Sequence, residues 1–392
     1  MRVLHTSDWH LGRSFKNVGM LGVQQRALEH LVDTVRAESV EAVLVAGDVY
    51  DRAVPGPEAV LLLSQTLEAL VGAGAQVVLS SGNHDSAVRL GFASGLLRRS
   101  GVHLVTDVAQ IGSAVRVGPL AIYPIPYLEP VVCAGPLGAA ERTHAGVMRA
   151  ALARVRAAHE GDDAVIAMAH GVATGGEGCE SERDIGVGGI SAVPPSVFAG
   201  LTYVAMGHLH GAQRITDTIH YSGSPYPMSF GEARHVKSWT LVDFARDGTL
   251  TDVRRVPVPV ERRLARLRGP IEALLTDPRH AADEDAWCSV VLTDPIRPRA
   301  AMERLRTRFP HAIELTFDPV GAPVGMASYA ARVAGRDALQ ICCDFVAHVR
   351  GGAPADEAER ATLRAALDEA RRARAVRDDE GLATRADPGA VA

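Results

Sequence analysis

The chain has 392 residues, of which 47% are hydrophobic and 22% are charged. This composition excludes global disorder, and the length predicts two or three domains. A formal net charge of −5 argues against a protein built mainly as a basic nucleic-acid coat. The only two lysines, Lys16 and Lys237, do not follow a glycine, so a G-x-x-x-x-G-K-[ST] phosphate-binding loop is excluded.

Cysteine usage and hydropathy indicate the compartment. The five cysteines, at positions 133, 179, 288, 342 and 343, lack C-x-x-C spacing, which favours a reducing compartment and argues against a cysteine-based zinc site. The chain begins without the segments of a signal peptide, and no stretch reaches about 18 uninterrupted apolar residues. We therefore expect a cytoplasmic protein with no membrane span.

Apolar runs alternate with helical patterns over about the first 250 residues. Helices are predicted over residues 24–37, 57–71, 86–98 and 141–159. Strands are predicted over residues 3–6, 42–46, 76–79, 114–122, 164–169, 203–206, 218–222 and 238–244, and Gly118-Pro119 indicates a hairpin within the fourth of them. Strands that alternate with helices are typical of stacked α/β layers.

Two proline-rich segments, 256–259 and 318–323, divide the rest of the chain. Between them, strands over 287–292 and 312–317 flank a helix over 298–309, which predicts a small α+β unit. Helices over 337–349 and 355–375 follow, and the glycine and proline breaks around them favour a detached helical element. We therefore predict four parts: a first domain over 1–255, a second over 256–322, a helical region over 323–378 and a flexible tail over 379–392.

Residues 254–308 form the locally basic part of the chain, with 12 arginines against 8 acidic residues. Four of these arginines could contact nucleic-acid phosphates: Arg262, Arg263, Arg266 and Arg268. The alternative is a solvated charged face without a ligand.

Polar side chains follow five of the apolar runs at the point where each run ends. They are Asp8 and His10, Asp48 and Asp51, Asn83, His84 and Asp85, His170, and His208 and His210. Because the carboxyl ends of strands in α/β sheets face the ligand crevice, we expect these side chains to meet in one site. Carboxylate, amide and imidazole ligands without sulfur suit Mn²⁺, Fe²⁺ or Zn²⁺ better than Ca²⁺. Even if only seven of these side chains are ligands, they exceed the need of one ion, and a carboxylate that bridges two ions would use them all.

The site residues lie in motifs that resemble those of the calcineurin-like metallophosphoesterase superfamily. Within it, the chain resembles the SbcD family of bacterial nuclease subunits, relatives of the Mre-type repair nucleases. The motifs are D-W-H-L-G (8–12), G-D-V-Y-D (47–51), G-N-H-D (82–85), H-G (170–171), G-H-L-H (207–210), G-S-P-Y-P-M-S-F-G-E (223–232) and K-S-W-T-L-V (237–242). The resemblance implies a layered α/β/β/α sandwich, followed by a small α+β capping domain and C-terminal helices.

The resemblance also implies a role for each site residue. Asp8, His10, Asp48 and His210 would hold a first metal ion, and Asp48, Asn83, His170 and His208 a second, with Asp48 bridging. His84 would be the catalytic imidazole, and Asp51 would orient it. Arg52 would contact the substrate phosphate, or else be an exposed loop arginine. Asp85 would serve only as a turn residue or as the N-cap of the helix that follows.

The implied function is a Mn²⁺-dependent DNA nuclease that uses two ions. It would be a double-strand 3′–5′ exonuclease and a hairpin or end endonuclease in DNA repair, recombination and replication. The implied partner is an SbcC-type coiled-coil ATPase, with the chain as a homodimer within a heterotetramer. Apolar residues of the last two helices, such as Phe345 and Leu363, would pack on that partner or return to the chain's own core.

Two other functions stay open. One is a metallophosphoesterase that acts on small phosphodiesters or phosphoproteins, which Asp51-Arg52 favours and the extra C-terminal units oppose. The other is a non-catalytic subunit that tethers DNA ends, which the presence of every ligand position and of His84 opposes.

Overall fold

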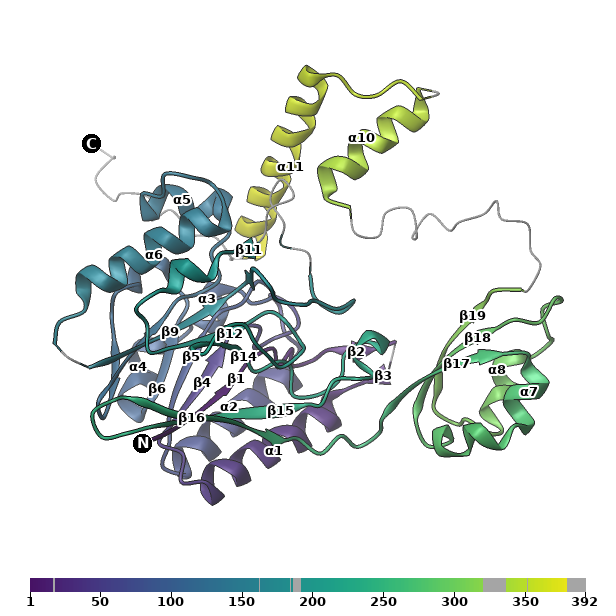
Figure 1. The fold of residues 1–392 in the computed structure, drawn as a ribbon, viewed down its shortest axis with the longest axis horizontal. Helices are drawn as coiled ribbons and strands as arrows, with labels where there is room; N and C mark the ends of the chain where they lie inside the picture. Colours follow the sequence, from purple (N-terminus) through teal and green to yellow (C-terminus); the bar gives the residue numbers. More distant parts are fainter. Residues whose placement is uncertain are drawn as a thin grey trace.

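The computed structural model describes residues 1–16, 18–161, 163–183, 185, 192–319, 336–350 and 352–378 (Figure 1). The predicted tail over 379–392 and residues 323–335 of the predicted helical region lie outside the described residues.

The first sheet has six strands in the order β16-β15-β1-β4-β5-β6. Their bounds are β1 Arg2–Thr6, β4 Ala42–Ala46, β5 Gln76–Ser80, β6 Val102–Val105, β15 Ser238–Phe244 and β16 Leu250–Pro257. The strands β1, β4, β5 and β6 are parallel, whereas β15 and β16 continue the sheet in antiparallel fashion. The helices α1 (Leu21–Ala37) and α2 (Pro57–Gly72) cover one face through an apolar core that includes Leu31 and Leu70.

The second sheet also has six strands, in the order β13-β14-β12-β9-β8-β7. Their bounds are β7 Val115–Val117, β8 Leu120–Pro124, β9 Ala164–His170, β12 Tyr203–Gly207, β13 Gln213–Arg214 and β14 Ile219–Tyr221. The four central strands are parallel, and β7 pairs with β8 as the predicted hairpin. Its outer face carries α5 (Pro130–Leu137), α6 (His144–Ala158) and the short η3 (Pro195–Phe198).

A third apolar cluster lies between the two sheets and contains Val3 and Leu44 from the first, and Ile122 and Ile166 from the second. His5 joins the sheets through this layer, because its ring nitrogens lie 3.0 Å from the Tyr203 hydroxyl and 3.2 Å from the Met206 carbonyl. The central strands have apolar neighbours on both faces, which explains why they are continuous apolar runs in the sequence. The predicted α/β/β/α layering is therefore confirmed.

Some elements differ from the sequence-based expectation. The helix expected over 86–98 is two short helices, α3 (Ala87–Leu90) and α4 (Ser94–Leu97), because Ala93 between them has a left-handed φ of 59°. The strand β16, which was not predicted, runs into the proline-rich segment as far as Pro257, since an edge strand tolerates a missing N–H donor. Among the other larger elements, β6, α5, α7 and β17 were also not predicted from the sequence.

The remaining small elements lie at the surface of the sandwich or beside the site. They are β2 Ser14–Phe15, β3 Val18–Gly19, η1 Arg98–Ser100, η2 Val108–Gln110, β10 Val172–Ala173, β11 Ala192–Val193 and η4 Phe230–Glu232.

A three-stranded parallel sheet, in the order β17-β18-β19, forms the core of the cap unit (Figure 1). Its elements are β17 Leu264–Gly269, α7 Ile271–Thr276, η5 Pro278–Asp283, β18 Trp287–Leu292, α8 Ala301–Arg306 and β19 Ala312–Phe317. Leu267 of β17 points into the apolar core of this unit, whereas the neighbouring Arg266 and Arg268 are exposed. Because side chains of a strand point alternately to its two faces, a half-buried β17 exposes Arg266 and Arg268. This alternation accounts for part of the basic segment over 254–308.

The two C-terminal helices, α10 (Ala338–Val349) and α11 (Glu357–Asp378), pack against each other through Leu339 and Cys343 of α10 and Leu363 and Leu367 of α11, with Ala355 from the segment between them. The helix α11 also contacts α5, so the helical region touches the first domain and is not fully detached (Figure 1). Among the described residues, no helix is long and apolar enough to cross a membrane.

Acid should weaken the contact that His5 makes between the sheets. Burial, with a smaller contribution from His220, lowers the pKa of His5 to about 3. The folded chain keeps the ring neutral while the unfolded chain takes up a proton near pH 6.5, so this contribution to stability falls as the pH drops from about 6.5 towards 3. We expect urea denaturation of metal-free protein to show a loss on the order of 2 kcal/mol between pH 6.5 and 5 that is smaller in a His5→Gln variant. Equal pH dependence in both proteins would contradict this assignment.

Candidate metal centre

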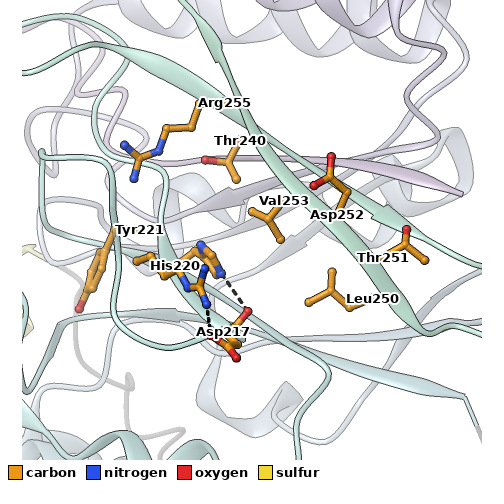
Figure 2. A pocket seen from close by; sticks show the side chains of 10 residues that line it. Asp217, His220, Tyr221, Thr240, Leu250, Thr251, Asp252, Val253 and Arg255 are labelled. Carbon is orange, nitrogen blue, oxygen red and sulfur yellow. Dashed lines mark hydrogen bonds and ion pairs between the residues drawn. The ribbon is translucent and has the colours of Figure 1, made fainter.

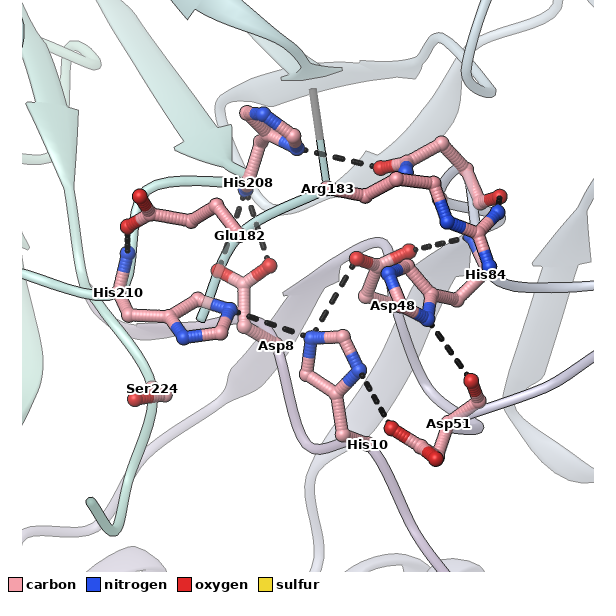
Figure 3. A network of polar contacts seen from close by, with 12 residues as sticks. Asp8, His10, Asp48, Asp51, His84, Glu182, Arg183, His208, His210 and Ser224 are labelled. Atoms are coloured by element: carbon pink, nitrogen blue, oxygen red, sulfur yellow. Dashed lines mark hydrogen bonds and ion pairs between the residues drawn. The ribbon is translucent and has the colours of Figure 1, made fainter. Parts of the chain in front are cut away.

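The two sheets bring all of the predicted ligands to one place, at the carboxyl ends of five parallel strands (Figure 3). Residues that follow β1, β4 and β5 meet residues from the ends of β9 and β12 on the facing sheet. Each of the seven predicted ligands is almost fully buried: Asp8, His10, Asp48, Asn83, His170, His208 and His210. The structure therefore brings the predicted ligand side chains together in one buried site, as the sequence analysis expected.

The first half of the cluster contains Asp8, His10 and His210, whose ligand atoms all lie within 4.8 Å of one another. The Nε2 atoms of His10 and His210 face each other at 3.2 Å, and His10 Nε2 lies 3.4 Å from Asp48 Oδ2. Asp8 accepts hydrogen bonds from the Ser7 hydroxyl and from the backbone N–H of His208, which fix its carboxylate.

The second half contains Asp48, His170 and His208, which form another group within 4.8 Å. Asn83 Oδ1 lies 2.9 Å from His170 Nε2 and 3.1 Å from His208 Nδ1. Asp48 Oδ2 lies 3.4 Å from His170 Nε2 as well as from His10 Nε2, so its carboxylate stands between the two halves.

The hydrogen bonds of His170 show that this donor set fits a cation. Its Nδ1 lies 2.9 Å from the Ala46 carbonyl, which can only accept, so Nδ1 carries a proton. In the neutral ring Nε2 is then an acceptor, yet it faces two further acceptor oxygens, of Asn83 and Asp48. Such crowded acceptors need a proton or a metal ion between them. Burial lowers the pKa of His170, but Asp48 and Asp8 outweigh it and raise the pKa to about 9.

Backbone strain is concentrated at the same strand ends. Eight non-glycine residues in the described part of the chain have left-handed φ values, and four of them are site residues. These are Asp8 at 55°, His10 at 42°, Asp48 at 49° and His208 at 98°. Each such conformation costs about 1–3 kcal/mol and persists only where the surroundings enforce it. At Gly82 a Cβ would overlap the Asp48 carboxylate, so the close approach of these two loops requires glycine.

Asp85 holds the loops after β4 and β5 together. Its carboxylate accepts hydrogen bonds from the backbone N–H groups of Val49, Tyr50 and Gly82, at 3.1, 2.8 and 2.8 Å. The N-cap of α3 is instead Ser86, whose hydroxyl accepts from the Arg89 N–H. Of the two predicted roles of Asp85, the N-cap was therefore wrong, and as a turn residue it joins the two loops that carry Asp48 and Asn83.

Asp51 contacts His84 through its main chain and not through its carboxylate. His84 Nδ1 donates to the Asp51 backbone carbonyl at 2.8 Å. The Asp51 carboxylate lies 3.5 Å from His10 Nδ1 and accepts from Arg13 at 3.2 Å (Figure 3). Asp51 therefore lies where it can orient His84, but it does so through its carbonyl, while its carboxylate faces the predicted ligand His10.

Arg52 does not enter the site: its side chain is 67% exposed and its guanidinium lies 3.9 Å from Asp51 Oδ2. The alternative of an exposed loop arginine fits this position better. Arg13 and Arg183, which were not predicted from the sequence, are the arginines beside the site, and Arg183 donates to the Asn83 carbonyl at 2.6 Å. Arg13 directly follows the D-W-H-L-G motif, which is a sequence signal for a place near the site. No motif of the sequence marks Arg183.

Two cavities lie near the sandwich. One, of about 280 Å³, opens beside the site between the first domain and the cap, and Arg13, Lys16, Ser181, Ser229 and Glu314 are among its lining residues. The other, of about 370 Å³, lies between β14 of one sheet and β15 and β16 of the other, and none of the predicted site residues lines it (Figure 2).

The four arginines of the basic cap segment all have acidic partners within the chain. Arg262 pairs with Asp285, Arg263 with Asp283, Arg266 with Glu180 and Arg268 with Asp318. These contacts favour the charged-face alternative over a nucleic-acid contact for this segment.

Comparisons with known proteins agree with this arrangement. Residues 1–212 match the family model described as calcineurin-like phosphoesterase, and residues 260–349 match the one described as type 5 capsule protein repressor C-terminal domain. The SbcD subunit of the SbcCD nuclease of Rhodobacter capsulatus is 37% identical over 325 residues, which cover 76% of this chain and 78% of that protein. The SbcD subunit of the same nuclease from Escherichia coli K12 is 31% identical over 318 residues, which cover 76% of each chain.

The solved structure of TT1561 from Thermus thermophilus is 14% identical with a TM-score of 0.39, over 66% of this chain and 99% of that one. This likeness adds nothing to the family assignment, which depends on the sequence matches. With a phosphoesterase match over more than half of its length and relatives at this level of identity, the chain belongs to the calcineurin-like phosphoesterases and, within them, to the SbcD nuclease subunits.

Proposed function

We propose that the chain is a DNA nuclease that uses two divalent cations, with Mn²⁺ as the preferred ion, together with an SbcC-type ATPase. The observation that carries this proposal is the convergence of seven buried ligand side chains beside His84. The family supplies the reaction class, phosphoester hydrolysis, and the relatives' name supplies the substrate class and the partner. We place the protein in the cytoplasm, in DNA repair, recombination and replication.

In this proposal Asp48 is shared by the two ions. Asp8, His10 and His210 complete the first ligand set, and Asn83, His170 and His208 complete the second. When bound, the cations offset charge on the phosphate oxygens and lower the pKa of the attacking water. The carboxylate, amide and imidazole donors, without thiolate, suit Mn²⁺.

His84 is the proposed catalytic side chain. Its Nδ1 is held by the Asp51 carbonyl, which leaves Nε2 to exchange a proton with the leaving 3′ oxygen. Burial lowers the pKa of His84, and Arg183 lowers it further against the opposing effect of Asp48. An approaching phosphate adds negative charge and raises that pKa again, so the ring gains a proton when substrate is present.

Two features of the first domain and the cap bear on the substrate. Arg13 and Lys16 line the cavity beside the site, and the buried Ser229 hydroxyl at this cavity has no hydrogen-bond partner among the described residues. Arg13 and Lys16 are paired with Asp51 and Glu314, so the Ser229 hydroxyl is the group among these that is left to bind a nucleic-acid phosphate between the first domain and the cap. The rival function on small phosphodiesters or phosphoproteins loses its main argument because Arg52 faces solvent.

We propose that α10 and α11 bind the coiled coil of the ATPase partner. Phe345 and Val349 of α10 stay exposed although the two helices pack against each other, which leaves an apolar face for a partner helix. The contact of α11 with α5 would carry that partner close to the first domain.

Exposed apolar side chains on α2, α3 and α4 support the proposed homodimer. Val60 and Leu61 of α2, Val88 of α3, Phe92 and, in α4, Leu96 are exposed, the last two by 80% and 71%. The helices α2 and α3 pack on the same core through Leu62 and Leu90. We assign the contact with a second copy to these exposed side chains, since large exposed apolar groups occur at interaction surfaces.

Removal of the His84 imidazole should abolish cleavage without emptying the metal sites. We expect a His84→Ala variant to cut linear duplex DNA in Mn²⁺ about 10²–10⁴-fold more slowly than the wild type, in the presence of partner and ATP. Arg52→Ala, which alters an exposed side chain in the neighbouring loop after β4, should stay close to wild type. Bound Mn²⁺, measured by calorimetry, should match in all three proteins. Full activity of His84→Ala, or hydrolysis by the wild type of a chromogenic phosphodiester but not of DNA, would contradict the proposal.

Deletion of residues 326–392 should remove the partner-binding helices and leave the metal centre intact. We expect the shortened chain to fail in a pull-down with the ATPase while it still cleaves single-stranded DNA in Mn²⁺. Retained association with the ATPase would show that α10 and α11 are not the binding element.

A charge on the apolar surface of α4 should separate the homodimer. Leu96→Glu places a carboxylate where a second copy would bury it, so we expect a monomeric mass in size-exclusion chromatography with light scattering. Ile296→Glu is the matched control, because Ile296 is 83% exposed on the cap. A dimer that persists in Leu96→Glu, or a wild type that is already monomeric, would refute this interface.

A further inference from the structure

A buried ion pair lies behind one of the predicted ligands. Glu232 of η4 and Lys237, just before β15, form an ion pair with only 1% and 3% of each residue exposed. They belong to the G-S-P-Y-P-M-S-F-G-E and K-S-W motifs, to which the proposed reaction assigns no role. Burying two charges costs several kcal/mol per ion, and apolar residues would pack there at least as well. Stability alone therefore does not account for this pair.

The contacts of the pair lead to His210. Lys237 Nζ donates to the His210 backbone carbonyl at 3.1 Å and to the Ser224 hydroxyl at 2.7 Å. Glu232 Oε1 accepts from the Ser181 hydroxyl at 2.5 Å, and the same hydroxyl lies 2.8 Å from His210 Nδ1. The carboxylate of Glu232 itself lies 3.5 Å from His210 Nδ1.

Every polar atom of His210 other than Nε2 is thus held by another group. The backbone N–H donates to Glu182 at 2.7 Å (Figure 3). The carbonyl accepts from Lys237, and Nδ1 meets Ser181 and Glu232. Nε2 faces His10 in the ligand cluster. A carboxylate behind a ligating imidazole fixes the ring and raises its basicity.

The other half of the cluster is supported differently. His170 Nδ1 donates to the backbone carbonyl of Ala46, so its alignment requires no charged side chain. Among the described contacts, none connects Glu232 or Lys237 to His170, His208 or Asn83. The ion pair can therefore act on one of the two proposed ions and leave the other unaffected.

We propose that Glu232 and Lys237 are positioning residues that hold His210 for the first cation, through Ser181 and through the His210 carbonyl. This inference rests on the proposed two-cation function. It predicts a selective effect. Loss of the ion pair weakens the binding of the cation proposed for Asp8, His10 and His210, and it leaves unchanged the binding of the cation proposed for Asn83, His170 and His208.

The test is a Mn²⁺ titration of metal-free full-length protein, followed by calorimetry and by electron paramagnetic resonance. The wild type should bind two ions. In Glu232→Gln, the affinity for one Mn²⁺ ion should fall about 10–100-fold, and the affinity for the other should stay unchanged. Ser181→Ala, which removes the linking hydroxyl and keeps the ion pair, should weaken the same ion. Thermal denaturation without metal reports whether each variant is folded.

Two further variants keep the test decisive. Glu232→Gln combined with Lys237→Met removes both charges together, so no lone buried charge is left to unfold the chain, and the same ion should still be weakened. Arg308→Met combined with Glu284→Gln is the matched control, because it removes an ion pair within the cap whose described contacts include none of the predicted ligands, and it should bind both ions as the wild type does.

Each outcome has one meaning. Wild-type binding of both ions in every folded variant would overturn the positioning role, as would an equal loss of both ions. A wild type that binds fewer than two ions would refute the proposed two-cation function instead, whatever the variants do.

Discussion

Acceptor atoms crowd together at the ends of five strands, and their mutual repulsion is the constraint on which the rest of the structure depends. The carboxylates of Asp8 and Asp48 and the imidazoles of four histidines are removed from water, where each acceptor would otherwise be hydrated. Buried polar groups without donors cost free energy, and charges interact strongly where the dielectric constant is low. Burial raises the pKa of Asp8 to about 6, whereas the neighbouring histidines outweigh burial at Asp48 and hold the pKa of that carboxyl well below its usual range. Divalent cations would turn this repulsion into attraction.

The sandwich supplies the rigidity that such a cluster needs. Two sheets packed face to face bring the loops of β1, β4 and β5 against the ends of β9 and β12, so the ligands come from both sheets. The left-handed backbone at four site residues is enforced by hydrogen bonds and close packing between these loops. Asp85 and Gly82 serve this purpose at one point, the first by binding three backbone N–H groups and the second by having no side chain.

The region around His210 is where the parts of the chain meet. Phe230, next to Glu232, packs on Phe15, which in turn lies edge-on to Trp287 of the cap. Arg266 of the cap donates to the Phe230 carbonyl and pairs with Glu180, one residue before Ser181. The cap therefore contacts the segments that carry Ser181 and Glu232, which support His210. The partner of His170 is instead a strand carbonyl within the first sheet. The two halves of the centre differ in how closely they are tied to the rest of the molecule.

The sequence by itself determined which polar side chains meet at one site and which strands carry them, whereas the family resemblance divided them into proposed ligands and other site residues. Apolar runs end at Asp8, Asp48, Asn83, His170 and His208, and parallel strands bring their carboxyl ends to one edge, so local pattern was sufficient. Only the tertiary structure decided that the Asp51 carboxylate faces His10, that Arg52 points to solvent, and that Glu232 and Lys237 stand behind His210. It also decided that the cap arginines pair with acidic residues distant in the sequence, such as Asp318 for Arg268. These outcomes depend on contacts between remote segments, for which neither side-chain periodicity nor motif spacing carries information.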